Sequence, residues 1–295
     1  MKRFLLIVAA VAVVVALASP AALAAGGGKV IYDSTVKPLP GNLPSVGAEA
    51  YSFTELGDEV TFAAGSRELQ RVTVTLSSWG CQVGHWFSAD CVTSPGAEFA
   101  VAITFNVYSP GPSNTAGALL GSRTQTFLVP YRPSSDNVRC TGGRWFDGPQ
   151  GCFNGLAANV TFDFSGQQLA LPDTAVFGIA YNTSHYGPHP IGEGAACYTS
   201  SGGCPYDSLN IGLAPQVRVG TKPFPNTVYQ NAVFASDYCD GGLAGFGVMR
   251  LDSPTSACWF DATQSFIPAV QFVARGDGDG SDNGGGDNGG VSGGE

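Results

Sequence analysis

The stretch Val101-Ala-Ile-Thr-Phe-Asn-Val107 alternates large apolar residues with small or polar ones. Successive side chains of a β-strand point to opposite faces, so this period of two predicts a strand with one face in a core. The same alternation recurs at residues 72–76, 160–164 and 177–181. Further short strands are predicted between clusters of Gly, Pro, Asn and Asp, at residues 30–32, 59–63, 124–129, 209–213, 217–219, 246–251 and 266–273. The pattern therefore predicts an all-β fold: a single β-sandwich of the jelly-roll kind, with long loops.

The composition limits the class of protein. The chain has 295 residues, of which 41 are Gly and 19 are Pro, and only 13% are charged. Its apolar share of 44% is that of an ordinary globular protein, which argues against a coiled coil or a wholly disordered chain. The net charge of −9 repels polyanions, so nucleic acid is not expected as a partner.

The N-terminus has the pattern of a secretory signal peptide. Lys2 and Arg3 precede an apolar run that ends at Ala18, and Ala22-Leu-Ala24 follows as a small-x-small cleavage motif. We therefore expect residues 1–24 to be removed and the mature protein to be secreted or displayed at the cell surface. No other segment is long and apolar enough to be expected to cross a membrane.

The other end of the chain has a different composition from the body. Half of the residues in 276–295 are Gly, and most of the rest are Asp, Asn and Ser. A segment of this kind cannot bury a core, so we predict a disordered tail. The body, residues 25–275, is predicted to be one β-sandwich domain.

All eight cysteines follow the expected signal peptide and fall into four close pairs. In an oxidising compartment such cysteines form disulfides, and the absence of a C-x-x-C spacing argues against zinc. Neither a metal nor a cofactor is expected. The short separations predict the bonds Cys81–Cys91, Cys140–Cys152, Cys197–Cys204 and Cys239–Cys258. Three of these bonds would staple long loops, at residues 79–98, 131–156 and 182–207.

Aromatic residues concentrate in or beside the cysteine-bearing segments: Trp79, Trp86, Phe87, Trp145, Phe146, Tyr186, Tyr198, Tyr206, Trp259 and Phe260. Flat rings can stack on sugars, or they can cover the disulfides as small apolar clusters. If the domain binds sugar, we predict that Trp86, Trp145 and Tyr186 stack on it. Asn182 and His185, which follow a predicted strand, would then hydrogen-bond to hydroxyl groups.

Three stretches carry a resemblance to a known family: Leu56-Gly-Asp-Glu-Val-Thr61, Leu69-Gln-Arg-Val-Thr-Val-Thr-Leu76 and Phe105-Asn-Val-Tyr108. They resemble secreted bacterial jelly-roll domains of the choice-of-anchor type, over residues 29–273. The resemblance implies a surface module and brings no catalytic residue with it. The Gly/Asp tail departs from the anchored pattern of that family.

These observations favour a non-enzymatic extracellular binding or surface module, with a glycan or another cell-surface ligand as its partner. A secreted polysaccharide hydrolase is the first alternative, and it would need a pair of carboxylates converging in a cleft. A structural cell-envelope protein is the second. No catalytic residue is assigned.

Overall fold

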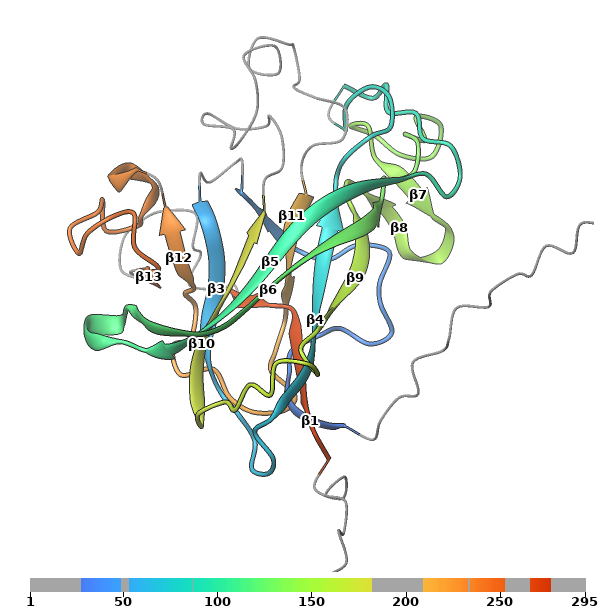
Figure 1. Ribbon diagram of the computed structural model, residues 1–295. Coiled ribbons are helices and arrows are strands. Elements are labelled where there is room, and N and C mark those ends of the chain that lie inside the picture. Colours follow the sequence, from blue (N-terminus) through green and yellow to red (C-terminus); the bar gives the residue numbers. More distant parts are fainter. Residues whose placement is uncertain are drawn as a thin grey trace, which may run out of the picture.

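The computed structural model describes residues 28–48, 53–86, 88–181, 209–232, 234–252 and 266–276. The predicted all-β fold is confirmed, because antiparallel strands build two large sheets and one small hairpin (Figure 1). The seven-stranded sheet has the order β1 (Lys29–Asp33), β15 (Val270–Ala274), β4 (Leu69–Ser78), β11 (Leu209–Ala214) and β14 (Ile267–Pro268), with β2 (Ser45–Gly47) on β11 and β9 (Leu156–Asp163) on β4.

The second sheet has six strands, in the order β13 (Arg250–Leu251), β12 (Tyr229–Ala232), β3 (Phe53–Thr61), β10 (Thr174–Tyr181), β5 (Glu98–Pro110) and β6 (Ala116–Pro130). The hairpin pairs β7 (Trp145–Asp147) with β8 (Gly151–Phe153). Short 3-10 helices cover Pro112–Asn114, Gly148–Gln150 and Ala235–Asp237. The hairpin lies beside one end of the two large sheets, away from β1 (Figure 1).

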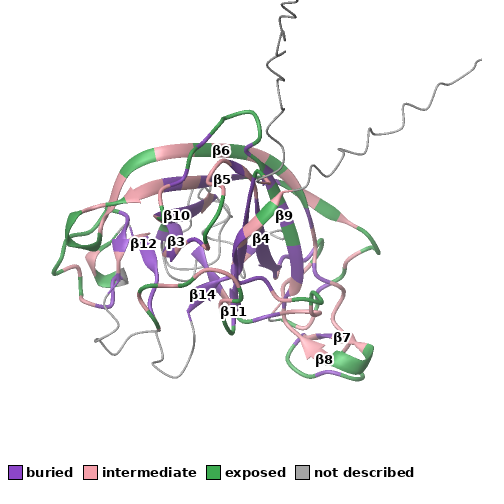
Figure 2. Ribbon diagram, turned by 90° about the horizontal axis from the view of Figure 1, so that it is seen from below, coloured by how far each residue is buried: buried purple, intermediate pink, exposed green. Residues whose placement is uncertain are grey.

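The two large sheets face each other across one core. The ring of Phe105 in β5 lies 5.6 Å from that of Phe272 in β15 and 5.5 Å from that of Phe162 in β9. These rings come from opposite sheets, so aromatic contacts join the layers. The alternation predicted for 101–107 is present, because Ile103, Phe105 and Val107 are fully buried while their neighbours are more exposed. Figure 2 shows that buried residues are concentrated in the central strands, such as β3 and β4.

Two predicted strands differ from the structure. Residues 217–219 form a single bridge between Val219 and Asp33, and within 246–251 only β13 is a strand. The second difference has a local cause: Gly245 and Gly247 adopt positive φ, which bends the chain out of an extended path. Strand β3 begins at Phe53, six residues before the predicted start at Glu59.

The cysteine pairing is confirmed where both partners are described, for Cys81–Cys91 and Cys140–Cys152. Cys239 is also disulfide-bonded. Its predicted partner Cys258, the predicted pair Cys197–Cys204, the signal peptide and nearly all of the tail lie outside the described residues. Within the described ranges, no helix has the length and apolar character needed to cross a membrane.

Candidate functional site

The two described disulfide loops are joined into one lobe around Arg132. This side chain is fully buried and donates hydrogen bonds to the backbone oxygens of Trp86 and Gly143, one in each loop. Burial lowers the pKa of Arg132 to about 10, which still leaves the guanidinium charged at neutral pH. Backbone hydrogen bonds from Arg132 to Gly80 and from Ser135 to Cys91 reinforce the join. The two disulfide loops therefore form one hydrogen-bonded lobe beside the sheets.

Within this lobe the β7–β8 hairpin is held by three contacts. The Cys140–Cys152 bond ties β8 to the preceding turn. The buried indole of Trp145 donates a hydrogen bond to the Gly155 carbonyl oxygen at 2.7 Å. The rings of Trp145 and Phe153 lie 5.6 Å apart. Together these contacts fix the position of the hairpin, and with it that of Asn154, the residue after β8.

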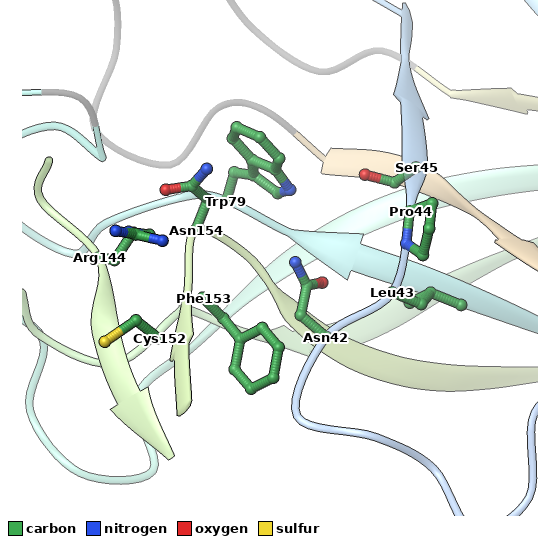
Figure 3. Close-up of a pocket in the computed structure, with 9 residues that line it drawn as sticks. All are labelled: Asn42, Leu43, Pro44, Ser45, Trp79, Arg144, Cys152, Phe153 and Asn154. Atoms are coloured by element: carbon green, nitrogen blue, oxygen red, sulfur yellow. The ribbon is translucent and has the colours of Figure 1, made fainter. Parts of the chain in front are cut away.

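A pocket of about 360 Å³ lies between the hairpin and the segment that leads into β2 (Figure 3). One wall comes from the hairpin region, with Arg144, Cys152, Phe153 and Asn154, and the other from Asn42, Leu43, Pro44 and Ser45. Trp79, just past the end of β4, closes it between the walls. The two walls are also linked directly, because the Gly41 amide donates to Gln150 Oε1 at 2.9 Å.

A short hydrogen-bond chain orients the polar groups of the pocket. Trp79 Nε1 donates to Ser77 Oγ at 2.9 Å, and Ser77 Oγ donates to Asn42 Oδ1 at 2.7 Å. This chain uses the acceptor of the Asn42 amide and leaves its NH₂ group without a partner among the described residues. Asn154, which Figure 3 shows beside Trp79, makes no side-chain hydrogen bond within the same part of the chain. Both amides are therefore available to a ligand.

The charge of the pocket is opposite to that of the protein. Arg144 is its one cation, and none of its described lining residues is acidic. The Arg144 guanidinium donates to the carbonyl and hydroxyl oxygens of Thr141, which hold it in place without neutralising it. A fixed guanidinium with no carboxylate beside it favours an anionic group on a ligand.

A close approach at Gly155 sets the position of Trp79. A Cβ at Gly155 would lie 2.3 Å from Ser77 Oγ and 2.4 Å from the indole of Trp79. Only glycine therefore lets the start of β9 pass this near to the end of β4. On another side, the ring of Trp86 meets that of Trp79 edge-on at 4.6 Å.

The predicted site residues have different places in the structure. Trp86 is half-buried and supports Trp79 from outside the described pocket lining. Trp145 is only 6% exposed, so its ring stabilises the hairpin and presents no open face to a sugar. Tyr186, Asn182 and His185 lie outside the described residues. In the sequence, Trp79 stands out only as one of many loop aromatics. No motif marks Asn42, Arg144 or Asn154, so the sequence does not predict them as site residues.

The pocket has no described carboxylate pair of the kind that glycoside hydrolysis needs. The carboxyls of Glu55 and Asp58, whose pKa values burial raises, both belong to β3 and not to the pocket lining. Among the described residues, no three His, Cys, Asp or Glu side chains gather as a metal site would require. The arrangement suits binding through rings and hydrogen-bond donors.

Comparison with known proteins finds no matching family model, no matching curated protein and no matching solved structure.

Proposed function

We propose that this protein is an extracellular, non-enzymatic binding module whose pocket holds an acidic sugar residue of a glycan. The observation that carries the proposal is the lining itself: two aromatic rings, two amide NH₂ groups without a partner among the described residues and one arginine, with no described acid. Aromatic rings offer apolar surface to a sugar ring, and amide groups and Arg are donors for its oxygens.

Each part of the pocket has a role in this proposal. Trp79 and Phe153 provide the apolar walls. Asn42 and Asn154 donate hydrogen bonds to hydroxyl groups, and Arg144 pairs with the carboxylate of a uronic acid. A carboxylate on the sugar is the feature that distinguishes the ligand from neutral glycans. The net charge of −9 disfavours long polyanions, so a short acidic unit within a glycan is preferred.

The lobe is organised before the ligand arrives. The Cys140–Cys152 bond, the buried Arg132 and the Trp145–Gly155 hydrogen bond already fix the hairpin wall. Ordered walls lose little conformational freedom on binding, which raises affinity for a given set of contacts.

Calorimetric titration of the mature protein with oligogalacturonides and, in parallel, with neutral cello-oligosaccharides tests the proposal. We expect binding of the acidic series only. Arg144→Gln should weaken it at least tenfold and Asn154→Ala about fivefold, since hydrogen bonds to charged groups are worth about 1.5–3 kcal/mol and neutral ones about 1 kcal/mol.

Arg123→Gln is the matched control, because it makes the same charge change on β6, outside the pocket lining. If it weakens binding as much as Arg144→Gln does, the effect comes from the general field and not from the pocket. Failure of both sugar series to bind, across a panel of acidic and neutral glycans, would favour the structural envelope role instead.

A further inference from the structure

A lysine and an aspartate meet inside the domain, outside the pocket. Asp58 in β3 is fully buried, and the Lys222 side chain is 5% exposed. Lys222 Nζ contacts Asp58 Oδ2, although the two residues are 164 positions apart in the chain. Lys222 belongs to the connection between β11 and β12, which runs along the end of the sandwich opposite the β7–β8 hairpin (Figure 1). Thr221, beside it, forms a bridge with Thr61 at the end of β3.

Charges at this depth are costly, and the cost favours the uncharged forms. Burial raises the pKa of the Asp58 carboxyl to about 7, against the opposing effect of the Lys222 ammonium. Burial also lowers the pKa of Lys222, against the effect of Asp58. A neutral amine beside a protonated carboxyl is a nucleophile beside its electrophile.

The remaining contacts of both groups suit an attack of the amine on the carboxyl carbon. Asp58 Oδ1 accepts a hydrogen bond from the Glu59 amide at 2.9 Å, which would stabilise negative charge developing on that oxygen. Lys222 Nζ donates to the Thr227 carbonyl oxygen at 2.6 Å, which fixes the direction of the amine. Oδ2, the oxygen that contacts Nζ, is then the one that leaves.

We infer that Lys222 and Asp58 become joined by an amide bond between Nζ and Cγ, formed by the folded chain itself. The Nζ–Cγ bond forms and the Cγ–Oδ2 bond breaks. Oδ2 keeps the carboxyl proton, takes one proton from Nζ and leaves as water. No electrons are transferred and no co-reactant is needed.

The surroundings favour the product over the ion pair. An amide carries no charge, so its formation removes the cost of holding two charges away from water. A cavity of about 330 Å³ adjoins the site, lined by Lys222 with Val217, Gly220, Thr221, Pro225, Asn226 and Ile267. It offers the released water a way out. The product would fasten the β11–β12 connection to β3 covalently.

The test is a tryptic map of the mature wild-type protein after reduction and denaturation. Trypsin cuts after Lys29, Arg67, Arg218 and Arg250 and spares Lys222, which precedes a proline. We expect the peptides 30–67 and 219–250 as one species, at their summed mass less one water. Recovery of both peptides free and at full mass would overturn the inference.

Lys222→Arg keeps the positive charge but removes the attacking amine, so its map should show the two peptides separately. Circular dichroism establishes that this variant is folded, and the wild-type map decides the matter if it is not. Lys37 and Asp33 provide an internal control, since their side chains meet at 3.1 Å with Lys37 57% exposed. Peptide 30–67 should show no loss of water from that pair, whose lysine is exposed. Loss of water there as well would mean that preparation of the sample, and not the buried site, joins the groups.

Discussion

Arg132 Nη2 donates a hydrogen bond to the Gly143 carbonyl oxygen, and both groups are buried. The same guanidinium reaches Trp86 O in the other disulfide loop. One side chain therefore joins two loops through backbone oxygens, with no described carboxylate as partner. The positive φ of Gly143, at 71°, allows this approach, and a Cβ there would lie 2.4 Å from Trp86 O.

Replacing Arg132 with Met should destabilise the domain, because methionine fills similar space but donates no hydrogen bond to the carbonyl oxygens of Trp86 and Gly143, of which Gly143 O keeps only the bond from Ser135 Oγ. We expect a loss of about 3 kcal/mol, which for a domain of this size lowers the thermal midpoint by roughly 10 °C. Differential scanning calorimetry measures it. Arg144→Met is the control: its guanidinium is half-exposed, and its loss should move the midpoint little. Equal shifts in the two variants would contradict the clamp role of Arg132.

Glu55 makes stability depend on pH. Burial raises the pKa of its carboxyl, although hydrogen bonds from Asn106 and Tyr108 oppose the rise. The folded state then holds the proton to higher pH than the unfolded chain does, so the contribution of Glu55 falls as pH rises through its folded pKa.

Glu55→Gln should therefore gain stability relative to wild type as pH rises from the pKa of a glutamate in the unfolded chain, about 4.3, to the raised pKa of Glu55 in the folded state. Chemical denaturation at a series of pH values gives the difference in unfolding free energy. Asp173→Asn, at an exposed carboxylate, provides the comparison. A difference that stays constant with pH for Glu55→Gln would show that the pKa of Glu55 is the same in the folded and unfolded states, and a difference that shrinks as pH rises would show that folding stabilises the carboxylate.

Gly155→Ala should displace Trp79, which lines the pocket. The added Cβ meets Ser77 Oγ and the Trp79 indole, so Trp79 must move and the hydrogen bond to Ser77 weakens. Overpacking of this kind costs about 1–3 kcal/mol. Tryptophan fluorescence and glycan titration report the change. Gly166→Ala, where a Cβ meets nothing within 4 Å, is the neutral counterpart. Unchanged binding in Gly155→Ala would show that the position of Trp79 does not matter to the ligand.

If the Lys222–Asp58 bond forms, Lys222→Arg should lose the stabilisation that a long covalent loop provides. Closing a loop of 164 residues restricts the unfolded chain by about 5 kcal/mol in the chain-entropy treatment. Guanidinium titration of wild type and variant measures the loss. Lys37→Arg, which keeps the ion pair of an exposed cation with Asp33, should cost almost nothing. Similar small losses of unfolding free energy in both variants would contradict the covalent bond.

The sequence predicts those parts of the fold that depend on neighbours along the chain. Strand β5 follows from the alternation at 101–107, and the two described disulfides follow from cysteines 10 and 12 residues apart. Strand β3 was predicted too short because Glu55 and Asp58 interrupt its apolar pattern. Both are buried, and their partners Asn106, Tyr108 and Lys222 come from distant segments. Only the folded structure shows that such polar residues belong inside.

The pocket could not be predicted for the same reason. Asn42, Trp79 and Asn154 come from three separate segments, and their side chains become neighbours only when β2, β4 and the hairpin assemble. Trp145 shows that the sequence does not distinguish between two roles of an aromatic side chain. An aromatic residue near a cysteine has the same appearance in sequence whether it binds a ligand or, as here, holds a hairpin.

Cys152 has a further consequence for when the pocket exists. Cys152 is one of the residues that line the pocket and its sulfur is bonded to Cys140, so this bond fixes the hairpin wall only in the oxidised protein. A newly made chain whose thiols are still reduced has the same side chains without the fixed wall. If the pocket binds the ligand proposed above, capture would then begin only after the Cys140–Cys152 bond has formed.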